Sequence, residues 1–369
     1  MEQMGSSTIQ VDRILLSHVT GIVEAVLLLP VLEALRESYP GTTIGVVTTS
    51  SAGPVYARSR VPPQIWTVGN WREGELLDPR QLWGTVRAIK ELRHDPVDLL
   101  VELIEDGPTR WLRACLPAPA WRLTPAGLHR GRTRSWERWI RRLWEPIGLA
   151  SQRREYPPAL HRTQEWLHQL EPLGVRPSVS APRLSTDASA DQRIARRLEK
   201  QKRAGRSESQ GLLIGLGAGD GLGGMDWRKE QVVSLARRLV HHYDARILLL
   251  NDPSRPSWIR EVESELRRAI PGRSLRLPAR LSFDETLSLL ARLSVLVAPL
   301  GSLAHLAAAV YTPVVALTRD PRPGPLDLLS PHTVHVRPSR LGVQLEDEQI
   351  YEGACQLMHI SRAELLTQR

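Results

Sequence analysis

Cysteine is scarce in this chain of 369 residues, and long apolar runs are lacking. The two cysteines, Cys115 and Cys355, lie far apart without the spacing of metal ligands. This excludes a disulfide scaffold and a zinc finger and favours a reducing compartment. The most apolar early segment, residues 19–32, is interrupted by Glu24 and Pro30, so it is too short and too charged to span a membrane. We therefore expect a soluble, cytoplasmic protein.

Acidic residues and phenylalanine are also under-represented. The chain has 40 acids against 49 lysines and arginines, which gives a net charge of +9, and one phenylalanine against eleven tryptophans. Nine arginines and one acid, Glu137, occur from Arg110 to Arg142, with tryptophans in or beside this basic segment. Such a charge balance favours acidic partners. Nucleic acid is not expected among them, because no known reader motif is present.

The basic segment has two interpretations. Arginine forks suit phosphate and carboxylate groups, and tryptophan suits sugar faces and membrane interfaces. The segment therefore predicts binding of an acidic glycan or a lipid surface, with Arg130, Arg132, Arg134 and Arg138 as candidate contacts. The alternative is a solvated amphipathic helix whose tryptophans lie in the core.

Strands and helices alternate in both halves of the sequence. The first half predicts strands at 13–17, 43–48, 65–68 and 97–103, and helices at 22–38, 79–93 and 135–149. The second half predicts helices at 191–203, 228–242, 257–270, 283–292 and 346–358, and strands at 212–216, 245–250, 274–277 and 294–298. Residues 171–190 have the composition of a linker. We expect an α/β protein with domains 1–175 and 176–369, parallel sheets and a site in the cleft between them.

Residues 286–317 form the most informative segment. They predict a helix, a buried strand, a glycine-serine turn, a small-residue helix and a second buried strand. In α/β sheets ligands bind at the carboxyl ends of the strands, where a helix N-terminus offers N–H groups to an anion such as a diphosphate. Gly301 and Ser302 form the turn, and His305 follows one turn later. His305 could contact a ligand; the alternative is a packed histidine bonded to the backbone.

The glycine-rich segment 217–224 also lies between a predicted strand and a helix. Its backbone N–H groups could approach a phosphate closely, with Gly217, Ala218 and Gly219 as first candidates. The segment lacks the Gly-Lys-Ser/Thr ending of a Walker loop and does not match a full G-x-G-x-x-G pattern. A flexible surface loop is therefore the alternative.

Glu24 lies just after Gly21 at the first strand–helix junction. A carboxylate there would face the expected interdomain cleft and could act as a general base. The alternative is a helix N-terminal charge that the macrodipole stabilises.

Two stretches of the chain resemble glycosyltransferase family 9, the ADP-heptose:lipopolysaccharide heptosyltransferases. They read RILLSHVTGIVEAVLLLPVLEALRESYPGTTIGVVT and LSFDETLSLLARLSVLVAPLGSLAHLAAAVYTPVVALT. The first is similar to the family's opening strand, catalytic loop and helix, and the second to its nucleotide-side strand and helix start. The resemblance implies a GT-B fold of two Rossmann-like domains with the site between them. It also implies inverting sugar transfer from a nucleotide-diphospho-sugar, with no metal and no cofactor beyond that co-substrate.

The sequence departs from the family pattern at ligand positions. The family's first loop carries Gly-Asp with the aspartate as base, where this chain has Val23-Glu24. In the Asn-Asp-Thr-Gly-Pro-x-His motif the aspartate becomes Leu300, and only His305 is unchanged. The family's phosphate-contacting lysine falls on Met225, although Arg228 or Lys229 could substitute. Its acidic residue after the next strand falls near residues 254–255, a serine and an arginine.

Two functions are compatible with these features. The first is a glycosyltransferase that moves a heptose-like sugar from an ADP-linked donor to an acidic or lipid-linked glycan such as a lipopolysaccharide core. It would work in the cytoplasm, peripherally at the inner membrane, with Glu24 as base. The second is a catalytically inactive relative that binds a protein or membrane partner through the basic, tryptophan-rich segment.

Overall fold

The computed structural model divides the chain into two compact units, Met1–Ser180 and Ala181–Arg369. It describes residues 11–69, 79–94, 96–104, 109, 113, 115–116, 119–130, 160–204, 211–217, 227–250, 256–275 and 281–358. Each unit contains one six-stranded sheet. Within these described ranges, no helix is both long and apolar enough to cross a membrane.

The sheet of the first unit has the order β3-β2-β1-β4-β5-β6. Its strands are β1 (Arg13–His18), β2 (Thr43–Thr49), β3 (Gln64–Val68), β4 (Leu99–Glu102), β5 (Trp121–Thr124) and β6 (Gly127–Arg130). All neighbouring pairs are parallel except β5 and β6, which form an antiparallel hairpin. The expected parallel sheet therefore carries one antiparallel strand at this edge.

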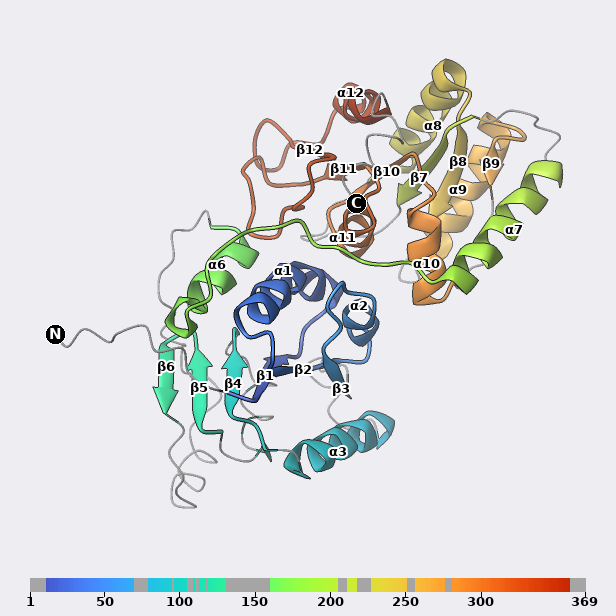
Figure 1. Ribbon diagram of the computed structural model, residues 1–369. Helices are drawn as coiled ribbons and strands as arrows, with labels where there is room; N and C mark the ends of the chain where they lie inside the picture. Colours follow the sequence, from blue (N-terminus) through green and yellow to red (C-terminus); the bar gives the residue numbers. More distant parts are fainter. Residues whose placement is uncertain are drawn as a thin grey trace. The chain divides into compact units, whose positions relative to one another are not determined.

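Helices cover both faces of the first sheet (Figure 1). They are α1 (Ile22–Ser38), α2 (Gly53–Ala57), α3 (Pro79–His94) and α6 (Arg162–Gln169), and a short 3₁₀ turn at Glu171–Leu173 follows α6. Helix α1 is apolar nearly all round and packs with α2 and α6 on one face, as expected of a helix buried on every side. Helix α3 covers the opposite face, where its Ala88, Ile89 and Leu92 join a core with Leu15 and Trp66.

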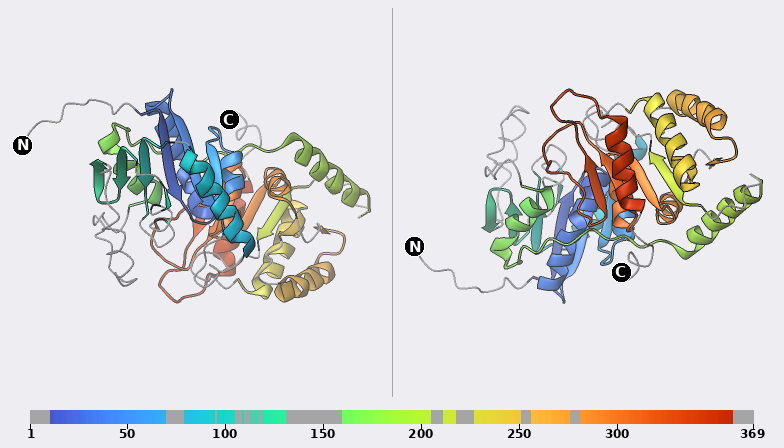
Figure 2. Two further views of the ribbon diagram at one scale, coloured as in Figure 1. Left: turned by 90° about the horizontal axis from the view of Figure 1, so that it is seen from below. Right: turned by 90° about the horizontal axis from the view of Figure 1, so that it is seen from above.

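The sheet of the second unit has the order β12-β11-β10-β7-β8-β9, and all its pairs are parallel. Its strands are β7 (Leu213–Gly217), β8 (Arg246–Leu250), β9 (Ser274–Leu275), β10 (Val295–Pro299), β11 (Val314–Leu317) and β12 (Thr333–Val336). Its helices are α7 (Ala188–Ala204), α8 (Lys229–Tyr243), α9 (Pro256–Ala269), α10 (Phe283–Leu290), α11 (Ser302–Ala309) and α12 (Asp347–Met358). Helices α8, α9 and α12 share one core with the strands, and α12 lies along β11 and β12 (Figure 2).

The alternating pattern predicted most of these elements to within a few residues. The fold class is confirmed, because both units are α/β sheets covered by helices. The β5–β6 hairpin, α2, α6 and β12 were not predicted. The expected helix at 135–149 lies outside the described residues.

Candidate active site

The order of the first sheet reverses between β1 and β4, which lie side by side at its centre. In open α/β sheets this switch point opens a crevice at the carboxyl ends of the strands, where ligands bind. The loop from β1 to α1 leaves the sheet at this point. The Thr49 hydroxyl at the end of β2 donates a hydrogen bond of 2.8 Å to the Thr20 carbonyl and so fixes this loop.

Glu24 lies in the first turn of α1 and is partly buried. Its carboxylate folds back toward the loop, since Oε2 lies 3.5 Å from where a Cβ on Gly21 would stand. Within the described part of the chain, no donor makes a hydrogen bond or ion pair to this carboxylate. The position suits a general base and equally suits a helix N-terminal charge, so the catalytic role stays a prediction.

A buried histidine lies beside this loop, at the end of β1. His18 is 1% exposed, and its Nδ1 lies 2.7 Å from the Tyr56 hydroxyl and 3.1 Å from Thr20 Oγ1. Its ring meets that of Trp166 edge to face, with centroids 5.2 Å apart. Burial lowers the pKa of His18 to about 3, so the ring is neutral near pH 7. In the tautomer whose Nδ1 carries no proton, the Tyr56 hydroxyl donates to that nitrogen.

Tyr56 bonds to this histidine and interacts electrostatically with Glu24. Burial raises the pKa of Tyr56 well above 10, and the nearby negative charge of Glu24 acts in the same direction. The phenol therefore stays protonated and keeps its hydrogen bond to His18. Sequence reasoning missed this pair because Tyr56 lies in the unpredicted helix α2; a histidine that ends the first strand was the available signal.

A second buried acid, Glu102, ends β4 beside β1. It is 1% exposed, and its Oε2 lies 3.2 Å from Arg113 and 3.8 Å from Arg122. Arg113 and Arg122, two arginines of the basic segment, thus pair with the buried Glu102. Arg130 ends β6, whereas Arg132, Arg134 and Arg138 lie outside the described residues.

The second sheet reverses its order between β7 and β10. Gly217 ends β7 against β10 and α11: a Cβ there would lie 2.7 Å from Ala298 Cβ and 2.9 Å from Leu303 Cδ2, too close for any side chain. The backbone can therefore pass close to the start of α11 only with glycine at this position. Ala218 and Gly219 lie outside the described residues.

Helix α11 begins directly after β10. Gly301 is its N-cap in extended backbone, and Ser302 is its first residue. The first N–H groups of a helix lack intrahelical partners, so this end can receive an anion. Leu300, which the sequence resemblance aligns with the family's aspartate, is 9% exposed, and its N–H donates to the Leu317 carbonyl at 2.9 Å.

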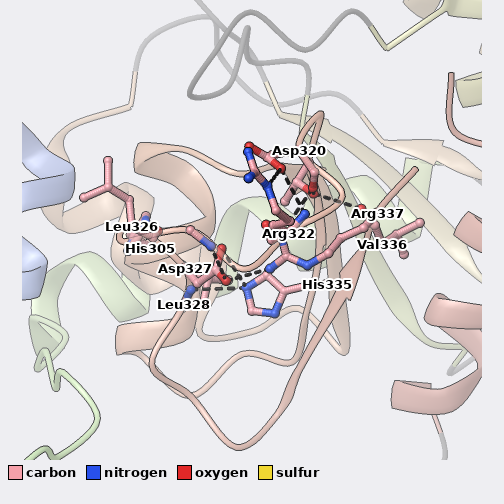
Figure 3. Close-up of polar contacts among 11 residues, drawn as sticks. His305, Asp320, Arg322, Leu326, Asp327, Leu328, His335, Val336 and Arg337 are labelled. Carbon is pink, nitrogen blue, oxygen red and sulfur yellow. Dashed lines mark hydrogen bonds and ion pairs between the residues drawn. The ribbon is translucent and has the colours of Figure 1, made fainter. Parts of the chain in front are cut away.

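His305 is packed inside the second unit rather than open to solvent. Its side chain is 1% exposed, and Nε2 lies 3.1 Å from the Leu326 carbonyl (Figure 3). The loop that it contacts is also bonded to β12 and the residue after it: His335 Nε2 accepts from the Leu328 N–H, and Arg337 bonds to Asp327 at 2.6 Å. This bond matches the alternative of a packed histidine bonded to the backbone. Contact of His305 with a nucleotide stays a prediction.

The two cations after the glycine-rich segment differ in their surroundings. Lys229 lies with its Nζ 2.9 Å from Glu265 and 3.7 Å from Glu261 of α9, and hydrogen bonding to Glu265 raises its pKa. Arg228 is exposed at the N-cap of α8, two residues beyond the undescribed loop. Arg228 is therefore the more available of the two for a phosphate.

Solved structures of sugar transferases share this fold. A family 9 glycosyltransferase from Veillonella parvula is 15% identical with a TM-score of 0.72, over 95% of this chain and 98% of its own. The E. coli ADP-heptose lps heptosyltransferase II is 14% identical with a TM-score of 0.64, over 96% and 99%. The E. coli heptosyltransferase WaaC with ADP is also 14% identical with a TM-score of 0.64, over 94% and 99%. At these identities the likeness shows the fold, which is GT-B.

No curated protein matches the chain in sequence. The model of one family does match, over residues 146–352, which is more than half of the chain. That match includes β7, β10 and α11, the elements that form the second switch point. The chain belongs to glycosyltransferase family 9 (heptosyltransferase).

Proposed function

We propose that the protein is an inverting, metal-independent glycosyltransferase that moves a heptose-like sugar from an ADP-linked donor to an acidic or lipid-linked glycan, such as a lipopolysaccharide core. The observation that carries this proposal is Glu24, a carboxylate without a hydrogen-bonding donor among the described residues, at the switch point of the first sheet. Family membership and the ADP in a solved relative support the donor class.

In the proposed reaction Glu24 accepts the proton of an acceptor hydroxyl. The acceptor oxygen then forms a bond to the anomeric carbon while the bond from that carbon to the diphosphate oxygen breaks, and the electron pair leaves with the diphosphate. Backbone N–H groups and a cation would stabilise the leaving charge. Glutamate is one methylene longer than the family's aspartate but accepts a proton equally well.

The second unit would hold the donor. Backbone from Gly217 through Ala218 to Gly219 and the α11 start at Gly301 and Ser302 would bind the diphosphate. Arg228 would supply the cation in place of the family's lysine, with Lys229 released from Glu265 only if donor binding competes for it. Loss of one charge-assisted contact weakens binding by about 1.5–3 kcal/mol, which leaves a working site.

The acceptor would bind to the first unit. An acidic glycan suits Arg130, Arg132, Arg134 and Arg138, which remain after Arg113 and Arg122 pair with Glu102. A lipid-linked acceptor would place the enzyme in the cytoplasm, peripherally at the inner membrane.

A non-catalytic binding or assembly protein is the second candidate. Two observations favour it: Leu300 is buried where the family's aspartate would be, and Lys229 is engaged with glutamates. This candidate requires that nucleotide does not bind and that Glu24 is dispensable. Arginine changes in 130–142 would then abolish a partner interaction.

Calorimetric titration with ADP, UDP, GDP and ADP-heptose tests the donor site first. We expect saturable binding of ADP and ADP-heptose. No binding up to several millimolar, by protein shown to be folded, would contradict the transferase and support the second candidate.

Single-turnover assays of Glu24→Gln test the base. Turnover should fall at least about 100-fold while ADP binding is unchanged, because a general base contributes about 10²–10⁴-fold. Glu37→Gln, at the exposed end of the same helix, is the matched control and should keep full activity. Intact turnover by Glu24→Gln would overturn the mechanism.

A further inference from the structure

Helix α3 has one face in the core and one face in solvent. Ala88, Ile89 and Leu92 are buried against the first sheet. On the opposite face Trp83 is 77% exposed and Val86 is 50% exposed. A single exposed apolar residue is ordinary, but a tryptophan and a valine three residues apart on one helix face form an apolar patch.

Basic side chains follow this patch toward the C-terminal end of the helix. Arg87 and Lys90 follow Trp83 by four and seven residues, so all three lie along the outer face. Arg93 lies in the last turn and also donates to the Cys115 carbonyl at 3.0 Å. The described side chains of α3, residues 83–94, include three cations and one acid, Glu91, which pairs with Arg87 at 2.9 Å.

We propose that this α3 face, defined by Trp83, Val86, Arg87 and Lys90, docks on an anionic lipid bilayer. Tryptophan prefers the headgroup level of a membrane, and basic side chains around an apolar stripe are attracted to anionic lipid. The positive face and the net charge of +9 complement such a surface.

This inference rests on the peripheral location given under the proposed function and assigns the surface for it, but its test requires neither donor nor turnover. Cosedimentation of the full-length protein with vesicles of phosphatidylcholine, with and without phosphatidylglycerol, measures it. Binding should require the anionic lipid, and Trp83→Ala should weaken it about tenfold. Leu341→Ala, which removes an apolar side chain 75% exposed in the second unit, is the control and should bind as the wild type does.

Two charge-reversal variants test whether the cations of the α3 face attract the protein to anionic lipid. Lys90→Glu and Lys200→Glu both change an exposed helical lysine and both lower the net charge from +9 to +7. Only Lys90→Glu should weaken vesicle binding, about tenfold or more. Equal loss in both variants would show that overall charge alone attracts the protein and would overturn the α3 surface.

Quenching by brominated lipid tests insertion directly. Trp83→Phe keeps an apolar ring, so it should bind vesicles but lose most of the quenching seen with the wild type. The proposal fails if quenching persists in Trp83→Phe, if Trp83→Ala binds normally, or if binding is equal on neutral vesicles. A protein that binds no vesicles yet is captured through α3 by another protein would likewise refute the lipid assignment.

Discussion

At the scale of single residues, the sequence predicted candidate site residues whose signal lies in neighbouring positions along the chain. Glu24 was found because it follows Gly21 at a strand–helix junction. The pair of His18 and Tyr56 was missed because it joins residues 38 positions apart, and such contacts depend on how the sheet assembles. The engagement of Lys229 with Glu265 was missed for the same reason.

The buried His18 should make stability depend on pH. Its pKa is about 3 in the folded chain against 6.5 in the unfolded chain, so between these values the unfolded state holds one more proton. The stabilisation is full above pH 6.5 and is lost as pH falls toward 3. From pH 7.5 to pH 5 the loss should be about 2 kcal/mol. Urea unfolding of the wild type and His18→Asn at both pH values measures it: the variant should lack this part of the loss, and equal pH dependence would disprove the assignment.

At the scale of elements, the sequence pattern predicted the long helices and most of the strands but not the β5–β6 hairpin. The strands of the β5–β6 hairpin are four residues each, too few for a period to be visible. The basic segment was treated as one binding surface, whereas Arg122 lies in β5 with its guanidinium on Glu102. Charge composition alone does not separate arginines that pair internally from those that meet solvent.

The packing of β7 against α11 predicts a specific sensitivity at Gly217. Gly217→Ala places a methyl 2.7 Å from Ala298 Cβ and should cost about 1–3 kcal/mol of stability, because neighbouring backbone must shift. If α11 holds the donor, the shift should also weaken ADP binding. Gly84→Ala, in the open middle of α3, is the control and should stabilise by about 0.5–1 kcal/mol. Urea unfolding and ADP titration measure both variants; an undiminished ADP affinity in Gly217→Ala would remove the α11 start from the proposed site.

At the scale of the whole molecule, two units carry separate cores and sheets with the same kind of order reversal. The alternating pattern and the linker composition foresaw two α/β halves because both signals are local. The antiparallel edge of the first sheet depends on long-range assembly and was not foreseen.

Because the two units have separate cores, substitutions in different units should change the free energy of unfolding independently. His18→Asn acts in the first unit, where the ring contacts Tyr56, and Gly217→Ala acts in the second, where Gly217 packs against Ala298. Their effects on unfolding free energy should therefore add to within about 0.5 kcal/mol in the double variant. A larger deviation in urea unfolding would reveal coupling between the units.

The backbone contact of His305 bears on how active enzymes are distinguished from inactive relatives of this chain. His305 ties helix α11 to the Leu326 carbonyl and so contributes to the packing of the second unit, whether or not any sugar is moved. Selection for a folded protein alone would retain it after turnover had been lost. A screen for working enzymes among divergent sequences should therefore rank candidates first by an acid at the position of Glu24, and should give the histidine less weight because packing alone would retain it.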